Sequence, residues 1–322
     1  MTGYSIHQIT MPTPFAVGDV HAYVVVGECV TLFDAGVNTE EAWNTLNQQL
    51  KEIGYQPVDI EQVVLTHHHP DHIGLLDRLD HVEHVLGHEL IDLWLKRDQS
   101  YFRSYIDFFN TMYDRWGVPT QYRNITKYLE NVMRFASNSA LSQTIKEGDH
   151  IPGLEELVTI ETPGHAQSHL SFYDQKTGNI IAGDHLIKHI SSNPLLEPPY
   201  KSNLERPKPL LAYRESMKKM LGYNINLIYP GHGEVFSGHH LLISERLEKQ
   251  EKRAHKVLSF LEDQPLNPFE ICKKLFPKHY ENEFGLTMSE TVGQLDYLEA
   301  VGEIKEIYEG NRAFFVANKN YV

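Results

Sequence analysis

The first part of the chain alternates short apolar runs with helical segments. The runs at 5–9, 22–26 and 30–33 are rich in β-branched or aromatic residues and have the length of strands, and a helix is expected at about 40–53. A further apolar run, within 61–66, predicts a buried strand that leads directly into the sequence HHHPDH. Strands that alternate with helices are typical of an α/β fold.

Between about residues 89 and 138 the pattern is different. This stretch has helical periodicity and many aromatic residues, and it lacks the alternation of a strand, so it predicts a helical insertion. Strand-sized runs return at 157–161, 169–173, 180–182 and 226–229. A long polar helix is expected at 237–261.

The last part of the chain has its own order of elements. Two prolines mark a linker at 264–268, and after it come two helices and then two short strands joined by Gly310 and Asn311. Helices followed by a β-hairpin suggest a small winged-helix domain. The sequence therefore predicts a main domain at 1–262 and a winged-helix-like domain at 265–322.

Charge and composition narrow the function classes. The 322 residues include 29 Lys or Arg and 43 Asp or Glu, and the formal net charge of −14 at pH 7 repels nucleic-acid phosphates. No apolar run approaches the ~18 residues of a membrane span, and no signal peptide is expected. The two cysteines lie far apart and predict neither a disulfide framework nor a cysteine-based zinc site. We therefore expect a cytoplasmic protein that has no membrane partner.

Four potential metal ligands lie within six residues, where the strand expected at 61–66 ends. His67 and His69 are two residues apart, so on an extended chain their side chains point the same way. Asp71 and His72 follow at the point where the chain is expected to turn into a helix. Imidazole nitrogen and carboxylate oxygen are ligands of zinc and of other borderline metals. A polar loop that happens to be rich in histidine is the alternative interpretation.

Three later fragments each place a His or Asp after a strand and a glycine turn. They are TPGH, which ends at His165, AGDH, which contains Asp184 and His185, and YPGHG, which contains His232. Small residues at these turns let the backbone approach a metal closely. A single Gly-His pair is a weak signal, but these fragments and the HHHPDH segment together predict one metal site.

These motifs resemble the metallo-β-lactamase superfamily. Its pattern is an early Asp, the sequence HxHxDH, a lone His, a lone Asp and a final His. The match extends over about residues 20–235 and includes Asp34 in FDAG as the early Asp. The resemblance implies an αββα sandwich with the site at one edge, to which the helical insertion and the winged-helix domain are added.

The resemblance also implies a ligand set for two divalent metal ions, with zinc preferred and manganese or iron as substitutes. One metal would be held by His67, His69 and His165, and the second by Asp71, His72 and His232. Asp184 would bridge the metals, and Asp34 would orient the ligands. A hydroxide between the metals is then the nucleophile, which Asp71 orients. For His185 two roles stay open, protonation of the leaving group and packing.

The C-terminal part resembles the β-lactamase-like subgroup with a winged-helix domain, which includes hydrolases of thioesters and related esters and also RNA endonucleases. We expect hydrolysis of a small-molecule thioester, ester or lactone. The endoribonuclease alternative requires basic residues, whereas residues 265–322 contain six Lys or Arg and nine Asp or Glu. The winged helix is therefore expected to serve in packing or in a homodimer. An iron-dependent dioxygenase and a non-enzymatic sensor are further alternatives with less support.

The helical insertion is expected to form a cap over the opening of the metal site, because its ends lie close in sequence to ligand motifs. Its aromatic residues, with Phe108 and Phe109 as examples, are expected to form one wall of the substrate pocket. Burying an apolar substrate tail against such a wall is worth roughly 0.8 kcal/mol per CH₂. Ordinary helix packing is the alternative role of these rings.

Overall fold

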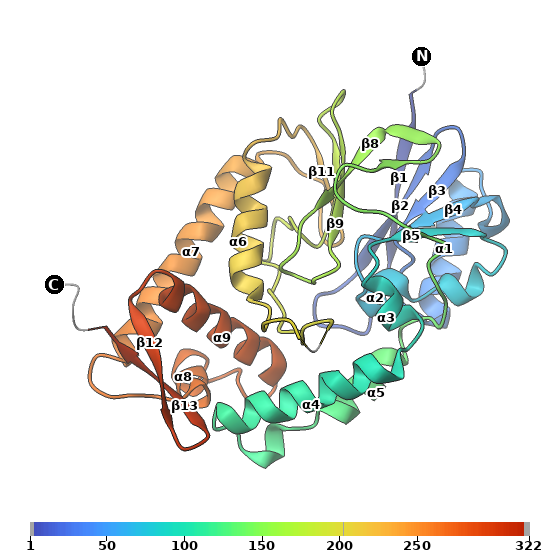
Figure 1. The fold of residues 1–322 in the computed structure, drawn as a ribbon. Coiled ribbons are helices and arrows are strands. Elements are labelled where there is room, and N and C mark those ends of the chain that lie inside the picture. The colour runs from blue at the N-terminus through green and yellow to red at the C-terminus, as the bar shows by residue number, and fades with distance from the viewer. Residues whose placement is uncertain (1–2, 202, 319–322) are drawn as a thin grey trace.

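The computed structural model describes residues 3–201 and 203–318, and within them two large β-sheets pack face to face (Figure 1). Helix α1 (Glu40–Glu52) covers the outer side of one sheet. Helices α6 (Pro209–Met220) and α7 (His239–Phe260) cover the outer side of the other. This arrangement is the αββα sandwich that the motifs imply.

The strands of the first sheet lie side by side in chain order. They are β1 (Ser5–Met11), β2 (Val20–Val26), β3 (Val30–Phe33), β4 (Gln62–Val64), β5 (His84–Gly87) and β6 (Gln143–Thr144). The first three strands pair in antiparallel fashion, and β3 to β6 pair in parallel. Crossover segments such as α1 therefore separate the parallel strands.

The second sheet is mostly antiparallel. Its spatial order is β11-β10-β9-β8-β7. The strands are β7 (His150–Ile151), β8 (Leu154–Glu161), β9 (Leu170–Asp174), β10 (Ile180–Gly183) and β11 (Ile228–Pro230). Since β10 and β11 pair in parallel and β8 runs the same way, these three strands end at one edge of the sandwich.

Apolar side chains from both sheets form the core of the sandwich. Phe33 of β3 meets Phe172 of β9 edge to face, with ring centroids 5.1 Å apart. Both rings are fully buried, as are neighbouring aliphatic residues of both sheets. The buried, β-branched character of β3 and β4 fits parallel strands that are covered on both faces.

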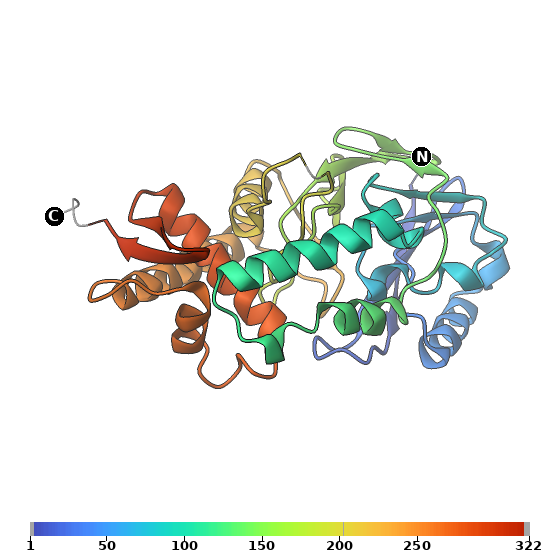
Figure 2. The same ribbon diagram turned by 60° about the horizontal axis from the view of Figure 1, so that its bottom comes forward.

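The helical insertion is present where the sequence predicts it. It comprises α3 (Ile91–Leu95), α4 (Gln99–Arg115), a 3₁₀ turn (Thr120–Tyr122) and α5 (Ile125–Met133). Figures 1 and 2 show α4 running from α3, beside the first sheet, to the C-terminal elements at the other end of the molecule. A row of rings at every fourth position of α4 is buried, namely Tyr101, Tyr105, Phe109 and Tyr113.

The C-terminal elements are two helices and a hairpin, in the expected order. They are α8 (Pro268–Leu275), α9 (Phe284–Ala300), β12 (Ile304–Glu309) and β13 (Arg312–Ala317). Helix α9 packs against α6, α7 and α8, and it is buried over most of its length. Tyr113 of α4 meets Phe284 of α9, with ring centroids 5.5 Å apart. The C-terminal part therefore shares a core with the insertion, and its winged-helix identity stays a prediction.

Among the described residues, no helix combines the length and the hydropathy that crossing a lipid bilayer requires.

Candidate metal centre

The segment after β4 brings the first group of candidate ligands to the edge of the sandwich. His69 is extended, with φ −66° and ψ 147°, and helix α2 (Pro70–Ile73) begins at the proline that follows it. Proline suits the first helical position because its fixed φ is helical and its missing N–H needs no partner there. Asp71 and His72 therefore lie on the first turn of a short helix and point back to the strand end.

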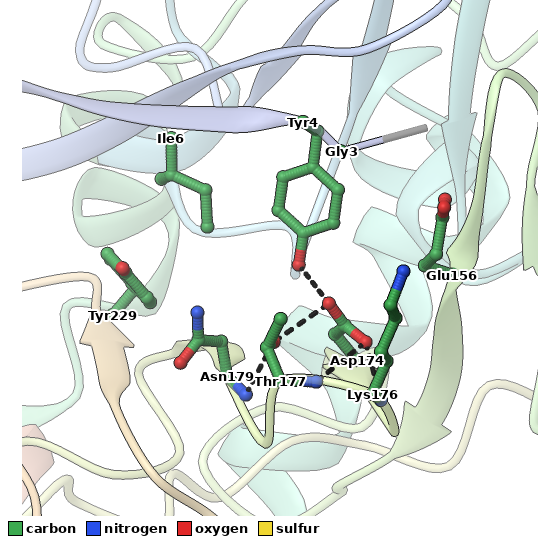
Figure 3. A pocket seen from close by; sticks show the side chains of 9 residues that line it. All are labelled: Gly3, Tyr4, Ile6, Glu156, Asp174, Lys176, Thr177, Asn179 and Tyr229. Atoms are coloured by element: carbon green, nitrogen blue, oxygen red, sulfur yellow. Dashed lines mark hydrogen bonds between the residues drawn. The ribbon is translucent and has the colours of Figure 1, made fainter. Parts of the chain in front are cut away.

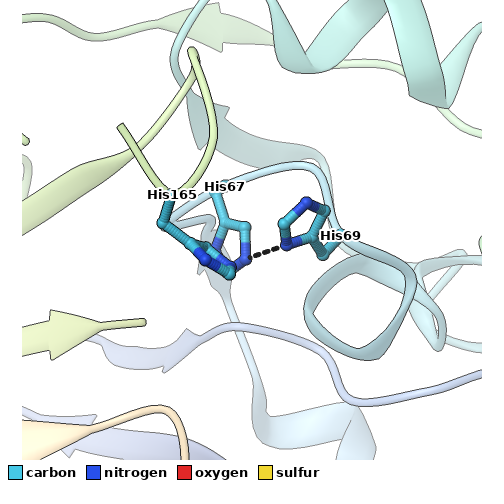
Figure 4. Close-up of side chains that lie close together, drawn as sticks. All are labelled: His67, His69 and His165. Carbon is cyan, nitrogen blue, oxygen red and sulfur yellow. Dashed lines mark hydrogen bonds between the residues drawn. The ribbon is translucent and has the colours of Figure 1, made fainter. Parts of the chain in front are cut away.

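The first cluster consists of His67, His69 and His165. One ring nitrogen from each of the three lies within 4.8 Å of the other two, and the rings converge in Figure 4. Nε2 of His67 and Nδ1 of His69 are 2.9 Å apart. His165 arrives from the turn after β8, so this cluster joins the two sheets.

The second cluster consists of Asp71, His72 and His232, again with ligand atoms within 4.8 Å of one another. His232 arrives from the turn after β11. Asp184, just after β10, lies between the clusters. Its Oδ2 is 3.4 Å from Nε2 of His165 and 3.4 Å from Nε2 of His232, and its Oδ1 is 3.5 Å from Nε2 of His72. The structure thus brings all seven predicted ligands together, with Asp184 in contact with both clusters.

Hydrogen bonds to Nδ1 orient three of these imidazoles. His72 donates its Nδ1–H to Oδ2 of Asp34 at 2.7 Å. His165 donates in the same way to the carbonyl of Asn193 at 2.9 Å, and His232 donates to the carbonyl of Asp19 at 2.7 Å. Since these acceptors are oxygens, each Nδ1 carries a proton, and each Nε2 is the nitrogen left to coordinate a metal.

Asp34 has the orienting position that the resemblance implies. It is one of the few non-glycine residues with a positive φ, at 62°. Its Oδ1 accepts from the backbone N–H of Thr66, and its Oδ2 accepts from the Thr66 hydroxyl, both at 2.8 Å. Because Oδ2 also accepts from His72, one carboxylate ties the strand end at Thr66 to the start of α2.

The atoms in this site fit a divalent cation. Nε2 of His72, Nε2 of His165 and Oδ1 of Asp184 are buried and have no hydrogen-bond partner. Buried polar atoms without partners are costly, and a cation at their meeting point removes that cost. Gly231 makes room for them, since a Cβ there would lie 2.1 Å from Oδ1 of Asp184.

Electrostatics also favours a cation. Burial lowers the pKa of His67 and of His69 well below the usual value, so both rings are neutral and free to coordinate. At His232 burial acts in the same direction, but the carboxylates of Asp184 and Asp71 outweigh it and raise its pKa to about 10. The carboxylates of Asp184 and Asp71 therefore stabilise a positive charge at the second cluster.

Other histidines near the site have roles outside the ligand set. His169 accepts the backbone N–H of Asp184 on Nε2 at 3.1 Å, and its Nδ1 lies 2.8 Å from the Thr162 hydroxyl, so it positions Asp184. His185 is fully buried against the ring of Tyr213, and burial lowers its pKa to about 3. A buried, neutral imidazole is a poor proton donor, so its environment favours the packing role.

A narrow cleft lies between the insertion and His68, which stands between two candidate ligands in the sequence. Its volume of about 10 Å³ is that of one water. Aromatic and apolar side chains line it together with His68 and Glu197, namely Leu90, Leu93, Trp94, Tyr101 and Tyr200. Neither Phe108 nor Phe109, the two rings named as examples, lines this cleft. Phe109 is buried in the row of rings on α4, whose first member, Tyr101, does line the cleft.

A larger cavity, of about 210 Å³, lies away from the metal centre (Figure 3). No candidate metal ligand lines it. Asp174 at its wall accepts from the Tyr4 hydroxyl at 2.7 Å and from the Thr177 hydroxyl at 2.8 Å. This carboxylate therefore joins the residue that precedes β1 to the turn after β9 and has a structural role.

Sequence reasoning missed several residues that shape the site. Thr66 stands directly beside a predicted ligand, and its position was the available signal, whereas the close approach at Gly231 was expected from its glycine turn. Asp19 and Asn193 act through backbone carbonyls, which leave no residue signature.

The chain belongs to the metallo-β-lactamase superfamily, since the family model described as "Metallo-beta-lactamase superfamily" matches residues 16–232. It is a metallo-hydrolase of that class. The "Probable metallo-hydrolase YqjP" of Bacillus subtilis strain 168 is 40% identical to it over 319 residues, which span 99% of this chain and 100% of that protein.

Solved structures show the same fold over nearly the whole chain. The metallo-beta-lactamase family protein TTHA1429 from Thermus thermophilus has a TM-score of 0.81 at 23% identity, covering 97% of this chain and 98% of its own. A beta-lactamase domain protein from Burkholderia ambifaria has a TM-score of 0.77 at 19% identity, covering 97% and 92%. Both matches extend through the C-terminal elements, so the added helices and hairpin recur in other members of the fold.

Proposed function

We propose that this protein is a dinuclear metal-dependent hydrolase that cleaves a thioester, ester or lactone. The observation that carries the proposal is the position of Asp184, within 3.4–3.5 Å of histidines from both ligand clusters. One cation would be held by His67, His69 and His165, and the other by Asp71, His72 and His232. Zinc suits this set of imidazoles and carboxylates, and manganese or iron are substitutes.

Two cations in these positions would supply a water activated as a nucleophile and a Lewis acid for the substrate oxygen. The protein's own residues supply the orientation. Asp71 is almost buried, and its Oδ2 lies 3.4 Å from Nε2 of His232, so its carboxylate can accept a hydrogen bond from the attacking water and align it. His69 is the half-buried member of the ligand set, which puts the opening to solvent on its side.

Charge around the site supports acyl substrates over phosphodiesters. Neither the candidate ligands nor the residues that line the adjoining cleft include a Lys or Arg. A phosphodiester backbone needs cations besides the metals, because each phosphate carries a full negative charge. An acyl substrate has no such need, and apolar side chains such as Trp94 and Leu93 are present in the small cleft beside His68.

The endoribonuclease alternative receives no support from the C-terminal part. In a winged helix that reads nucleic acid, a helix must reach the groove with exposed basic residues. Helix α9 contains no Lys or Arg, and packing against α6, α7 and α8 buries it. We propose that the substrate is a small molecule and that α9 does not contact nucleic acid.

The test is a substrate screen of the purified protein with metal analysis. Thioesters, esters and lactones are compared with RNA and a phosphodiester, before and after chelation. We expect acyl hydrolysis that the chelator abolishes and that Asp184→Asn also abolishes. Glu299→Gln serves as a control, because its side chain is exposed, and it should keep the activity. RNA cleavage in the absence of acyl hydrolysis would overturn the proposal in favour of the nuclease.

A further inference from the structure

The segment between β10 and α6, residues 184–208, forms one side of the metal centre. Its described residues contain no helix or strand, so the regular backbone hydrogen bonds of a helix or a sheet do not hold it in place. It is nevertheless anchored near the ligands. The carbonyl of Asn193 accepts Nδ1–H of His165 at 2.9 Å, and Arg246 of α7 donates to the carbonyls of Ile187 and Ile190.

The middle of this segment is joined to the HHHPDH motif through Glu197. Its Oε1 is 2.8 Å from Nε2 of His68, and its Oε2 accepts the backbone N–H of Gln167 at 2.8 Å. His68 in turn lies 2.8 Å from the Ser168 hydroxyl and stacks on Trp94, with ring centroids 4.4 Å apart. These contacts turn the His68 side chain away from the metals, so that it connects their strand to residues 184–208.

Helix α9 anchors the same segment on both sides of Glu197. The hydroxyl of Ser289 accepts the backbone N–H of Leu196 at 3.1 Å. Asp296 pairs with both terminal nitrogens of Arg206, one of them at 2.9 Å. Ser289 and Asp296 are seven residues apart, so they occupy one face of the helix.

That face of α9 also lies against α6. Gly293, four residues after Ser289, belongs to it, and a Cβ at Gly293 would lie 2.8 Å from Cβ of Leu210. Glycine thus permits a close approach of α9 to the start of α6, directly after residues 184–208. Ser289, Gly293 and Asp296 together make this face complementary to the segment and to the helix that follows it.

We infer that the C-terminal part acts within its own chain, as the anchor that holds residues 184–208 against the metal centre. Ser289, Asp296 and Glu197 are positioning residues, which act through the Asn193 carbonyl on His165 and through His68 on the strand end. This inference rests on the proposed metal site for its effect on His165, whereas the anchoring itself does not depend on a metal.

Limited trypsin digestion of the full-length, metal-loaded protein measures the anchoring. Lys188 and Lys201 lie in the segment and are exposed, and the cleavage rate reports how often the segment opens. We expect cleavage there to rise about tenfold in Asp296→Asn, which loses a charged hydrogen bond, and about threefold in Ser289→Ala. Cleavage elsewhere in the chain is the internal reference for global loosening.

Glu299→Gln is the matched control. Glu299 is also on α9 and pairs with Lys208 at the end of the same segment, at 3.3 Å, but both side chains are well exposed. Exposed pairs contribute little, so this variant should be cleaved at the wild-type rate. If Asp296→Asn and Ser289→Ala also match wild type, or if Glu299→Gln opens the segment equally, the anchoring is refuted.

The visible absorption of the Co²⁺-loaded protein tests the effect on the ligands. The bands of bound Co²⁺ respond to ligand geometry, so Asp296→Asn should shift them and Glu299→Gln should not. A faster-cleaved segment with an unchanged spectrum would overturn the link to His165. A wild-type protein that binds no Co²⁺ would instead refute the proposed metal site and leave the digestion result standing.

Discussion

Replacing Gly231 by alanine should break the metal centre while leaving the fold intact. A Cβ at this position would lie 2.1 Å from Oδ1 of Asp184 and 2.8 Å from Cε1 of His72. Ordinary Cβ contacts begin at 3.4 Å, so Asp184 must move by roughly 1 Å. The backbone cannot yield instead, because the Gly231 N–H donates to Gly183 and its carbonyl accepts from His21, at 2.8 and 2.7 Å.

The displacement removes Asp184 from the point at which it contacts both clusters. A shift of about 1 Å in such a group can cost about 100-fold in activity, and we expect kcat/KM for the best acyl substrate to fall by that factor. Metal content should fall from two ions per chain to one or fewer. Overpacking should cost about 1–3 kcal/mol of folding stability, which a domain of this size can tolerate.

Gly285→Ala provides the matched control for this experiment. Gly285 is exposed in the first turn of α9, and a Cβ there would meet nothing within 4 Å. This variant should keep both metals and full activity and gain about 0.5–1 kcal/mol in stability, because alanine favours the helix. Metal content is measured by elemental analysis, and stability by urea unfolding. A Gly231→Ala protein with two metals and wild-type kcat/KM would refute the steric argument.

Three further predictions concern the metals, the C-terminal part and the insertion. Chelation should lower the melting temperature by several degrees, reversibly with added zinc, since a ligand at 100 times its Kd stabilises by about 2.7 kcal/mol per site; an unchanged melting curve would contradict this. Fluorescence titration with RNA or DNA at physiological salt should give only weak binding, and sub-micromolar affinity with a steep salt slope would reverse the substrate ranking. Phe109→Ala and Trp94→Ala should each lose about 3–5 kcal/mol of stability, because both rings are buried. Only Trp94→Ala should also raise KM for acyl substrates, because Trp94 stacks on His68 beside the candidate ligands; steady-state kinetics with thermal unfolding separates the two effects.

Much of the candidate site could be predicted from the sequence because its signals are local. His67, His69, Asp71 and His72 follow one strand in a fixed spacing, and the geometry of a strand end and a helical turn determines which way they point. The glycine turns before His165 and His232 mark the other strand ends in the same way. Strand β5 was not predicted, although β3 and β10 have the same length and were, because its residues HVLG include only one β-branched residue.

Features that depend on long-range packing could not be read in advance. The repeat of aromatic residues on α4 predicts a buried face, but a repeat does not say what buries it, and the structure places Phe284 of α9 against it. The absence of basic residues from α9 is visible in the sequence. Its burial against α6 and α7 is not, because that burial depends on how the whole chain folds.

The sequence by itself determined the candidate ligands, their order and the superfamily, because these follow from side-chain chemistry at fixed positions along the chain. Only the tertiary structure decided how the ligands are held. The carbonyls of Asp19 and Asn193 orient His232 and His165, and every residue has a carbonyl, so no sequence pattern identifies these two. Glu197 meets His68 across 129 positions of the chain, and only the packing of both sheets and α9 brings the two side chains together.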